Sequence, residues 1–231
     1  IASWGGTRIR PWTPRDCYEK VLKELVSEGL VSKEEYATRT AYTKPYKNRP
    51  TSAGSLYNGM INPIKGFKAR GFLWYQGCSN RDRAFDYGKL LVSLIKDWRK
   101  AWGNDEMPFL IAQLVQYRYD GEQYLSLPVV IEGQYYAAQT LKNVYVAPTT
   151  DLSFGSIIHP PFKREVGERL AGIALDKSYG MPGFASESPR FKSMEIQGNK
   201  VVLHFTGMAD SDKFDAVGDN FSWVDKNMKI I

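Results

Sequence analysis

His159 is the side chain best suited to acid–base chemistry in this 231-residue chain, which contains only two histidines. It lies in the turn-rich stretch DLSFGSIIHPP, directly before two prolines that stiffen the backbone and begin a helix. A neutral imidazole on a rigid loop can accept a proton near pH 7, so His159 is a candidate general base. The nearest carboxylates in the sequence are those of Asp151 and Glu165. The alternative is a loop histidine that only caps the following helix.

The other histidine, His204, lies in the stretch VVLHF, where apolar and polar residues alternate. Such alternation is typical of a strand with one face in contact with water. His204 is then a side chain on the polar face of that strand, and we predict a structural role for it.

A second group of polar residues, QGCSN at 76–80, follows directly on the apolar run FLWY at 72–75. The apolar run is expected to form a buried strand, and Gly77 allows the chain to turn sharply after it. From Ala84 to Trp102, large apolar residues recur at spacings of three and four, which predicts an amphipathic helix. The polar group therefore lies on a strand-to-helix loop, at the carboxyl end of a strand, where α/β proteins place their chemistry.

The elements that must position these residues alternate between strand and helix. The first helix is expected to begin at Thr13 as its N-cap and to end at Gly29, and a second begins at Ser32; a loop follows from Thr40 to Ser55. Then come strands at 72–75, 108–114 and 144–147, which alternate with helices at 84–102, 128–142 and 163–175. This order predicts an α/β fold, with a parallel sheet and helices on its faces.

Beyond residue 180 the pattern changes to alternation, and MEIQGNKVVLHF is typical of a β-hairpin with Gly198 and Asn199 at its turn. We therefore predict an α/β domain over 1–180, without its first strand. A β-rich segment over 185–231 is predicted to be the start of an accessory β domain.

Composition excludes several functional classes. The net charge of +6 is scattered along the chain without a run of five like charges, so we expect no nucleic-acid partner; a basic nucleic-acid-binding protein would instead show an affinity that falls steeply with salt. No stretch approaches the roughly 18 apolar residues of a membrane span. Cys17 and Cys78 have no metal-binding spacing, and no metal site is predicted.

Five stretches together resemble the sialate O-acetylesterase family in their order and spacing. They are WGGT at 4–7, LYNGMI at 56–61, LWYQGCSN at 73–80, DWRKAWG at 97–103 with PFLIAQL after it, and IHPPFKREVGERLA at 158–171. The family belongs to the SGNH class of serine hydrolases, so the resemblance implies a flavodoxin-like three-layer sheet. It also implies removal of acetyl groups from an acetylated carbohydrate, without a metal or organic cofactor. An acetylxylan or other plant-polysaccharide esterase is one alternative, and a non-catalytic glycan-binding relative is the other.

The resemblance also implies an oxyanion hole. The stretch QGCSN matches the family's third motif block, whose polar side chain helps bind the oxyanion; Gln76 is the first choice for that role and Asn80 the second. Gly6 of WGGT matches the second block, where a backbone N–H must approach the acyl oxygen closely. Cys78 stands where the family usually has Glu, so this chain lacks the carboxylate that the family has beside the site.

His159 matches the family's catalytic histidine, but its acid partner does not follow directly. The DxxH spacing common in this class would need Asp at 156, where the chain has Ser156. Asp151 is the candidate acid, and a Ser-His dyad oriented by a backbone carbonyl is the alternative.

The family's nucleophile is the serine of a Gly-Gln-Ser-Asn-Met motif, which does not occur in this chain. Ser79 imitates that motif but falls on the oxyanion block. We therefore expect a preceding polypeptide segment to carry the nucleophilic serine.

Three residues are candidates for binding substrate. Trp4 offers a surface on which a sugar can stack. Arg8 and Arg10 would point to the same side of an extended segment and could bind the carboxylate of a sialic acid, which neutral xylan lacks. The alternative is that they pair with surface carboxylates or cover the first helix. Families of this kind are usually exported, which implies a periplasmic, secreted or lysosomal location.

Overall fold

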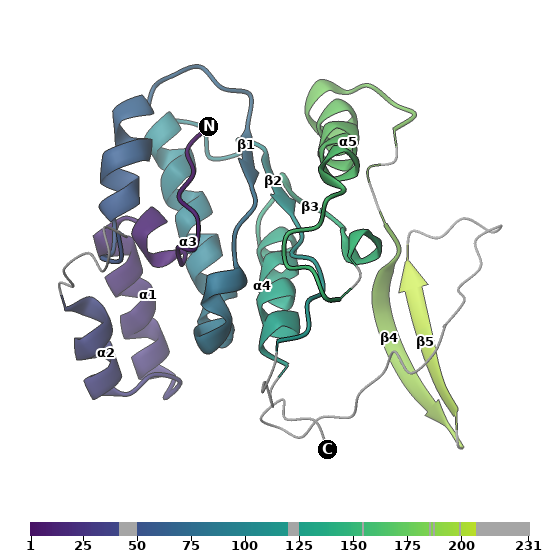
Figure 1. Cartoon of the computed structure of the whole chain (residues 1–231), viewed down its shortest axis with the longest axis horizontal. Coiled ribbons are helices and arrows are strands. Elements are labelled where there is room, and N and C mark those ends of the chain that lie inside the picture. The colour runs from purple at the N-terminus through teal and green to yellow at the C-terminus, as the bar shows by residue number, and fades with distance from the viewer. Residues whose placement is uncertain are drawn as a thin grey trace.

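Three strands form a parallel sheet at the centre of the computed structural model, which describes residues 1–41, 50–119, 125–153, 155–184, 186, 188–198 and 200–206. The strands pair in the order β1 (Phe72–Trp74), β2 (Phe109–Ala112) and β3 (Val144–Ala147). Helix α3 (Ala84–Trp102) connects β1 to β2, and α4 (Ser126–Thr140) connects β2 to β3 (Figure 1). The predicted alternation of strand and helix in an α/β fold is confirmed.

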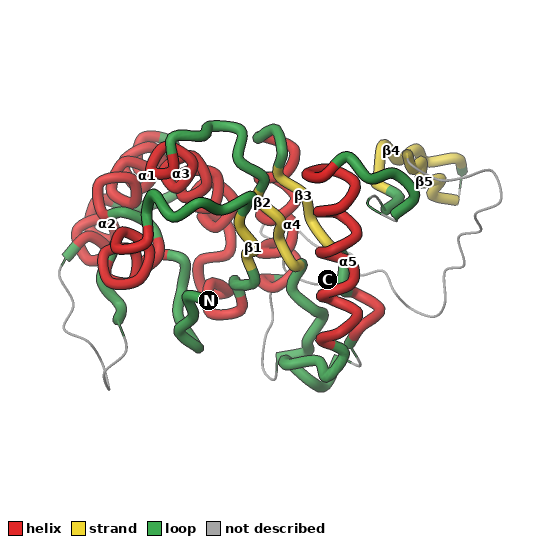
Figure 2. The backbone as a smooth tube through the Cα atoms, turned by 90° about the horizontal axis from the view of Figure 1, so that it is seen from above, coloured by secondary structure: helices red, strands yellow, loops and turns green. Residues whose placement is uncertain are grey.

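Helices cover both faces of the sheet, because the middle strand alternates its apolar side chains between them. Phe109 and Ile111 pack into the main core, with α3 and α4. Leu110 and Ala112 pack on the other side against α5 (Lys163–Ile173). Figure 2 shows α5 on the side of the sheet away from α1 and α3. The result is a three-layer arrangement, as expected of a parallel sheet whose central strand is apolar throughout.

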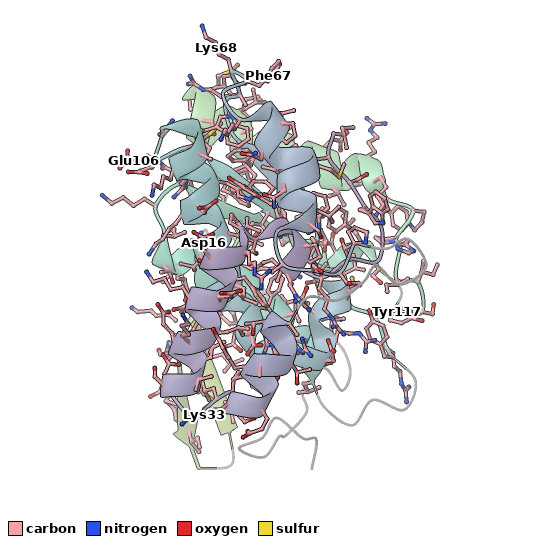
Figure 3. The ribbon with its side chains drawn as sticks, turned by 90° about the vertical axis from the view of Figure 1, so that its left-hand side faces the viewer. Asp16, Lys33, Phe67, Lys68, Glu106 and Tyr117 are labelled. Carbon is pink, nitrogen blue, oxygen red and sulfur yellow. The ribbon has the colours of Figure 1, made fainter. Side chains whose placement is uncertain are left out.

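Helices α1 (Arg15–Ser27) and α2 (Lys33–Thr40) lie side by side outside α3; Figure 3 shows them from the front, with Asp16 and Lys33 marking their first turns. The sequence had indicated Thr13 as the N-cap of α1, and this prediction is wrong. The Thr13 hydroxyl donates to the carbonyl four residues earlier, and Pro14 takes the cap position. Gly29 has a φ of 74°, which confirms the predicted stop, and the Ser32 hydroxyl caps α2 as predicted.

Short helical turns occur between the main elements. They are 3₁₀ turns at Arg10–Trp12, Asn62–Ile64, Cys78–Arg83 and Thr150–Leu152, and π-helical turns at Tyr57–Ile61 and Ala174–Ser178. Residues 42–49 of the predicted loop from Thr40 to Ser55 lie outside the described residues, and Thr40 itself belongs to α2. The turn at Arg10–Trp12 matters most here, because it replaces the extended segment assumed for the two arginines.

Strands β4 (Arg190–Gln197) and β5 (Lys200–Thr206) form the predicted antiparallel hairpin, with Gly198 at a φ of 63° in its turn. Asn199 lies outside the described residues. Apolar pairs stand directly opposite one another across the hairpin: Phe191 and Phe205, Met194 and Leu203, Ile196 and Val201. The division into an α/β domain and an accessory β domain stays a prediction. Within the described ranges, no helix is long and apolar enough to cross a bilayer.

Candidate active site

Three loops meet at the carboxyl edge of the sheet, because the strands are parallel and each loop follows the end of one strand. Buried polar residues are concentrated there: Asn80 after β1, Gln113 after β2, Thr149 after β3, and Gln134 from α4. A buried polar group costs free energy unless it is hydrogen-bonded, so a concentration of them at one edge indicates an organised site.

The Gln76 side chain ties the loop after β1 to the N-terminal segment. Its Nε2 donates to the Thr7 carbonyl at 3.0 Å and to Asn80 Oδ1 at 2.9 Å, and its Oε1 accepts from the Tyr87 hydroxyl at 3.2 Å. The amide orientation follows from the partners, since a carbonyl such as that of Thr7 can only accept. Both N–H groups of Gln76 are therefore engaged, and neither is directed at a substrate.

Asn80 is 3% exposed, and its Oδ1 accepts both from the Ile9 backbone N–H at 3.0 Å and from Gln76. These two donors fix the amide, so that Nδ2 must point away from them. Among the described residues Nδ2 has no hydrogen-bond partner, yet it is not one of the fully buried atoms that lack a partner. Asn80 thus offers a fixed and accessible N–H donor at the carboxyl edge, whereas Gln76 does not.

Gly6 lies beside this pair, in the turn that precedes Thr7. Its φ of 69° is in the left-handed region, which favours glycine over any residue with a side chain. The Thr7 hydroxyl donates to the Trp4 carbonyl at 2.8 Å and accepts from Trp12 Nε1 at 3.0 Å, which holds the turn. Trp4 itself is partly exposed. Gly6 is therefore placed next to the residue that Gln76 binds, as a backbone donor to the site would need.

Two residues that sequence reasoning missed, on helices α3 and α4, hold the loop that carries Gln76 through hydrogen bonds to its backbone. Tyr87 of α3 donates its hydroxyl hydrogen to the Gln76 carbonyl at 2.9 Å and accepts from Trp74 Nε1 at 3.2 Å. Gln134 of α4 donates to the Gln76 carbonyl at 3.4 Å and accepts from the Leu114 backbone N–H at 3.0 Å. The loop after β1 is thus held by both helices that cover one face of the sheet.

Gln113 does the same for the loops after β2 and β3. Its Nε2 donates to Thr150 Oγ1 at 2.8 Å, its Oε1 accepts from the Tyr135 hydroxyl at 2.7 Å, and its carbonyl accepts from Thr149 Oγ1 at 2.8 Å. The only signal in the sequence was a glutamine at the end of the apolar stretch PFLIAQL, which alone could not indicate its partners.

His159 lies on the loop after β3, at the same edge, and is exposed. Within the described part of the chain it makes no hydrogen bond or ion pair. Asp151 does not contact it, because both carboxylate oxygens accept from Arg169 of α5, at 2.7 and 2.6 Å. The hydrogen bonds from Arg169 lower the pKa of the Asp151 carboxyl. The pairing of His159 with Asp151 therefore stays a prediction that these contacts do not support.

The two arginines proposed to bind substrate face in different directions. Arg8 donates through Nε to the Ser79 carbonyl at 3.1 Å and pairs with Asp82. Arg10 donates to the Ala41 carbonyl at 3.1 Å and lies 5.7 Å from the Tyr18 ring centre. The expectation that they share one side of an extended segment is wrong, because a 3₁₀ turn begins at Arg10 and rotates its side chain towards α1 and α2.

A different pair of cations lies close to the QGCSN loop. Arg81 covers the Tyr119 ring at 3.2 Å, and Lys163, the first residue of α5, donates to the Tyr75 hydroxyl at 3.2 Å. Burial raises the pKa of the Cys78 thiol, and the charges of Arg81 and Lys163 offset only part of that rise. Cys78 is therefore uncharged at neutral pH, where a glutamate would add a negative charge. Among the described residues, no group of three or more potential metal ligands occurs.

The parallel three-layer sheet, with a histidine loop and a fixed amide donor at its carboxyl edge, is the arrangement of an SGNH-type hydrolase. The family model described as carbohydrate esterase, sialic acid-specific acetylesterase, matches residues 1–176, and the chain belongs to this family.

Relatives of known name agree with that membership. The chain is 27% identical over 243 residues to mouse sialate O-acetylesterase and 29% identical over 223 residues to the human protein; the alignments cover 89% of this chain and 43% and 40% of those proteins. The crystal structure of a carbohydrate acetylesterase from Xanthomonas citri superimposes with a TM-score of 0.71 at 28% identity, over 88% of this chain and 41% of that one. The chain thus spans less than half the length of the relatives it matches.

Proposed function

We propose that this chain supplies the general base and the oxyanion donors of a carbohydrate O-acetylesterase. The observation that carries the proposal is the Asn80 amide. Two hydrogen bonds fix it, and its Nδ2 has no partner among the described residues at the edge where His159 lies. An accessible amide donor for which the described residues provide no partner has a use if a substrate oxygen completes its hydrogen bonds. Family membership over residues 1–176 supports the reaction class.

The proposed reaction is ester hydrolysis by acyl transfer. A serine hydroxyl, deprotonated by His159, attacks the acetyl carbonyl, and the negative charge that develops on the oxygen is bound by Asn80 Nδ2 and by backbone N–H groups near Gly6. The bond between the acyl carbon and the sugar oxygen then breaks, and His159 gives its proton to that oxygen, which leaves as the sugar hydroxyl. Water repeats the sequence on the acetyl-enzyme and releases acetate. Gln76 acts in this scheme as the residue that orients Asn80.

The nucleophile of this scheme lies outside the 231 residues, since they contain no Gly-Gln-Ser-Asn-Met motif. Strand β1 has room for it: within the described residues β1 pairs with β2 alone, and Leu73 is 68% exposed. Strands of parallel sheets are normally buried on both faces, so an added strand and helix at this edge would complete the sheet. We propose that a preceding segment supplies that strand and its serine.

His159 has no acid partner among the residues that the structure describes, and we propose that it works as a Ser-His dyad. The Asp151 carboxylate accepts hydrogen bonds from Nη1 and Nη2 of Arg169. It would have to give up that bidentate pair to reach His159. A triad in which Asp151 is the acid is thus the second choice. Replacement of the Asp151 carboxylate distinguishes the dyad from that triad.

An acidic sugar is the substrate that the charges near the site favour. Lys163 and Arg81 lie close enough to Cys78 for their charges to lower the pKa of its thiol, so two cations stand beside the loop that carries Asn80. A sialic acid carboxylate would gain from that charge, whereas neutral acetylxylan would not. Export to the periplasm, a lysosome or the medium is expected for a protein acting on such sugars, and a leader in the full gene product would support it.

Acetate release from two substrates tests the proposal. The full-length protein is assayed with O-acetylated sialic acid and with acetylated xylo-oligosaccharide, and Lys163→Met is compared with Lys192→Met, a lysine on the distant strand β4. We expect turnover of the sialic acid, and a selective rise in its KM for Lys163→Met alone. Acetate release from the xylo-oligosaccharide only would overturn the proposal of an acidic sugar as substrate. Release from neither substrate, with sugar binding retained in calorimetry, would favour the non-catalytic glycan-binding alternative.

A further inference from the structure

The hydroxyl group of Tyr87 is fully enclosed and lies beneath the candidate active site rather than in it. Its side chain is 0% exposed, in the core between α3, α4 and β1. Burial raises the pKa of the hydroxyl, so it remains protonated and has one hydrogen to donate. That hydrogen is directed at Gln76, whose carbonyl and Oε1 lie 2.9 and 3.2 Å from the Tyr87 oxygen.

The Gln76 amide is fixed from two opposite sides as a result. On one side the Thr7 carbonyl can only accept, so it requires Nε2. On the other side the Tyr87 hydroxyl accepts from Trp74 Nε1 and shares its one hydrogen between the Gln76 carbonyl at 2.9 Å and Oε1 at 3.2 Å, an arrangement that favours Oε1 on this side. A flipped amide would place an oxygen against the Thr7 carbonyl, so only one of the two orientations satisfies both partners.

The orientation of Gln76 in turn decides that of Asn80. With Nε2 of Gln76 on one side and the Ile9 N–H on another, two donors converge on the same atom of Asn80, which must be Oδ1. Nδ2 is then left free for the substrate. Without Tyr87, Oε1 of Gln76 would lose its donor, and rotation of the amide would allow Asn80 to turn Nδ2 away from the site.

The backbone between the two residues is too tightly packed to absorb such a rotation. Gly77 has a φ of 149°, and a Cβ there would lie 2.7 Å from Leu114 Cδ1 and 3.3 Å from the Tyr87 hydroxyl. The loop therefore passes directly over Tyr87. We infer that Tyr87 is a positioning residue for the oxyanion donor, acting on Asn80 through the side-chain amide of Gln76; this rests on the proposed function of the site.

The test is a double-mutant cycle in the full-length protein. Tyr87→Phe removes only the hydroxyl, and we expect kcat for acetate release to fall about tenfold, the size of one lost neutral hydrogen bond, with KM within about twofold of wild type. In an Asn80→Asp background, which has no Nδ2 to orient, the same change should have no further effect on kcat. Equal losses in both backgrounds, or no loss in either, would overturn the inference.

A matched control separates this effect from simple destabilisation of the core. Tyr18→Phe removes another buried hydroxyl, one that accepts from Arg39 Nε at 3.4 Å on the neighbouring helix and has no contact with the site. We expect a lower melting temperature for both variants but a lower kcat only for Tyr87→Phe. If Tyr87→Phe does not fold, Gln76→Met, at a half-buried position, replaces it in the cycle with Asn80→Asp. A kcat of Gln76→Met equal to that of the wild type would contradict the inference.

A readout that needs no activity keeps the inference distinct from the proposed function. Both N–H groups of the Gln76 amide are bonded, so their hydrogen exchange, followed by NMR, should be slow in the wild type and at least about tenfold faster in Tyr87→Phe. If the wild type is inactive but the exchange is faster in Tyr87→Phe, only the proposed function is overturned and the positioning role of Tyr87 stands. Unchanged exchange would overturn the positioning role whether or not the protein is active.

Discussion

The two halves of the candidate site are built in opposite ways. The amide half, Gln76 and Asn80, lies within the protein, and its polar atoms are bonded to the N-terminal segment and to helix α3. The histidine half is an exposed loop, and within the described residues His159 has no partner. Charge stabilisation depends on dipoles that are fixed in advance, whereas a base must exchange protons with its surroundings. Changes around Gln76 should therefore alter both folding and turnover, whereas replacement of His159 should alter turnover alone.

The largest expected effect is at the histidine. We expect His159→Ala in the full-length protein to lower kcat by about three to four orders of magnitude, the contribution typical of a lost catalytic base, without lowering the melting temperature. The reason is that the exposed ring stabilises nothing in the described structure. Acetate release and thermal unfolding measure the two quantities. His204→Ala on β5, whose ring pairs with Glu195, is the control and should leave kcat unchanged.

Asn80→Asp should have the next largest effect. The carboxylate can still accept from the Ile9 N–H and from Gln76 but has no N–H to donate, so the fold is kept while the donor is lost. One oxyanion donor is worth about 2.7–4 kcal/mol, and we expect kcat to fall by about two to three orders of magnitude. Steady-state kinetics measure this fall. Activity within a factor of three of wild type would show that Asn80 is not the donor.

Gly77→Ala should affect stability in the amide half. Its φ of 149° and the 2.7 Å approach of a Cβ to Leu114 Cδ1 mean that a side chain there must displace either the loop or the Leu114 side chain. We expect the free energy of unfolding to fall by about 1–3 kcal/mol, together with kcat. Denaturant unfolding measures the first quantity, and Gly155→Ala, on the histidine side, is the comparison. A Cβ at Gly155 meets no atom within 4 Å, so the backbone φ of 73° is the only strain there.

The smallest effect is expected for Asp151→Asn. The Asp151 side chain is 64% exposed, and its pair with Arg169 should contribute at most about 1 kcal/mol to the free energy of unfolding. Because the pair lowers the pKa of the carboxyl, this stability is present above about pH 4, the usual pKa, and is lost as the pH falls through the lower folded value. Unfolding curves of both proteins should converge at low pH.

The same substitution distinguishes the dyad from a triad. For a Ser-His dyad we expect kcat of Asp151→Asn to stay within about threefold of wild type at neutral pH. A fall of several orders of magnitude would instead assign Asp151 as the acid partner of His159.

Elements with a strong apolar period were predictable from the sequence. Helix α3 begins and ends where its apolar spacing indicated, and β3 occupies the predicted residues. Thr13 was misassigned because a threonine before a helix can bond back to an earlier carbonyl as readily as it can cap, and only the 3₁₀ turn before it decides between the two. The arginine pair failed for the same reason, since side-chain direction depends on local backbone that composition does not reveal.

The site was predictable only at the level of its loops. A polar group directly after a strand indicated the loop that carries Gln76 and Asn80, but the assignment of the donor between them depends on contacts 69 and 71 residues apart in the sequence, to Thr7 and Ile9. Tyr87 resembled any apolar position of an amphipathic helix. Nothing local distinguishes a tyrosine that fills space from one whose hydroxyl orients an active-site amide.

The aromatic residues beside this network provide it with an optical signal. The Trp74 indole, whose N–H bonds to Tyr87, lies edge-on to Trp12 at 6.3 Å and to Trp98 at 5.7 Å between ring centres. Indoles packed this closely at nearly perpendicular angles couple their electronic transitions and give strong circular dichroism in the near ultraviolet. The intensity of that band is therefore a label-free measure of how well the residues beneath the site are packed.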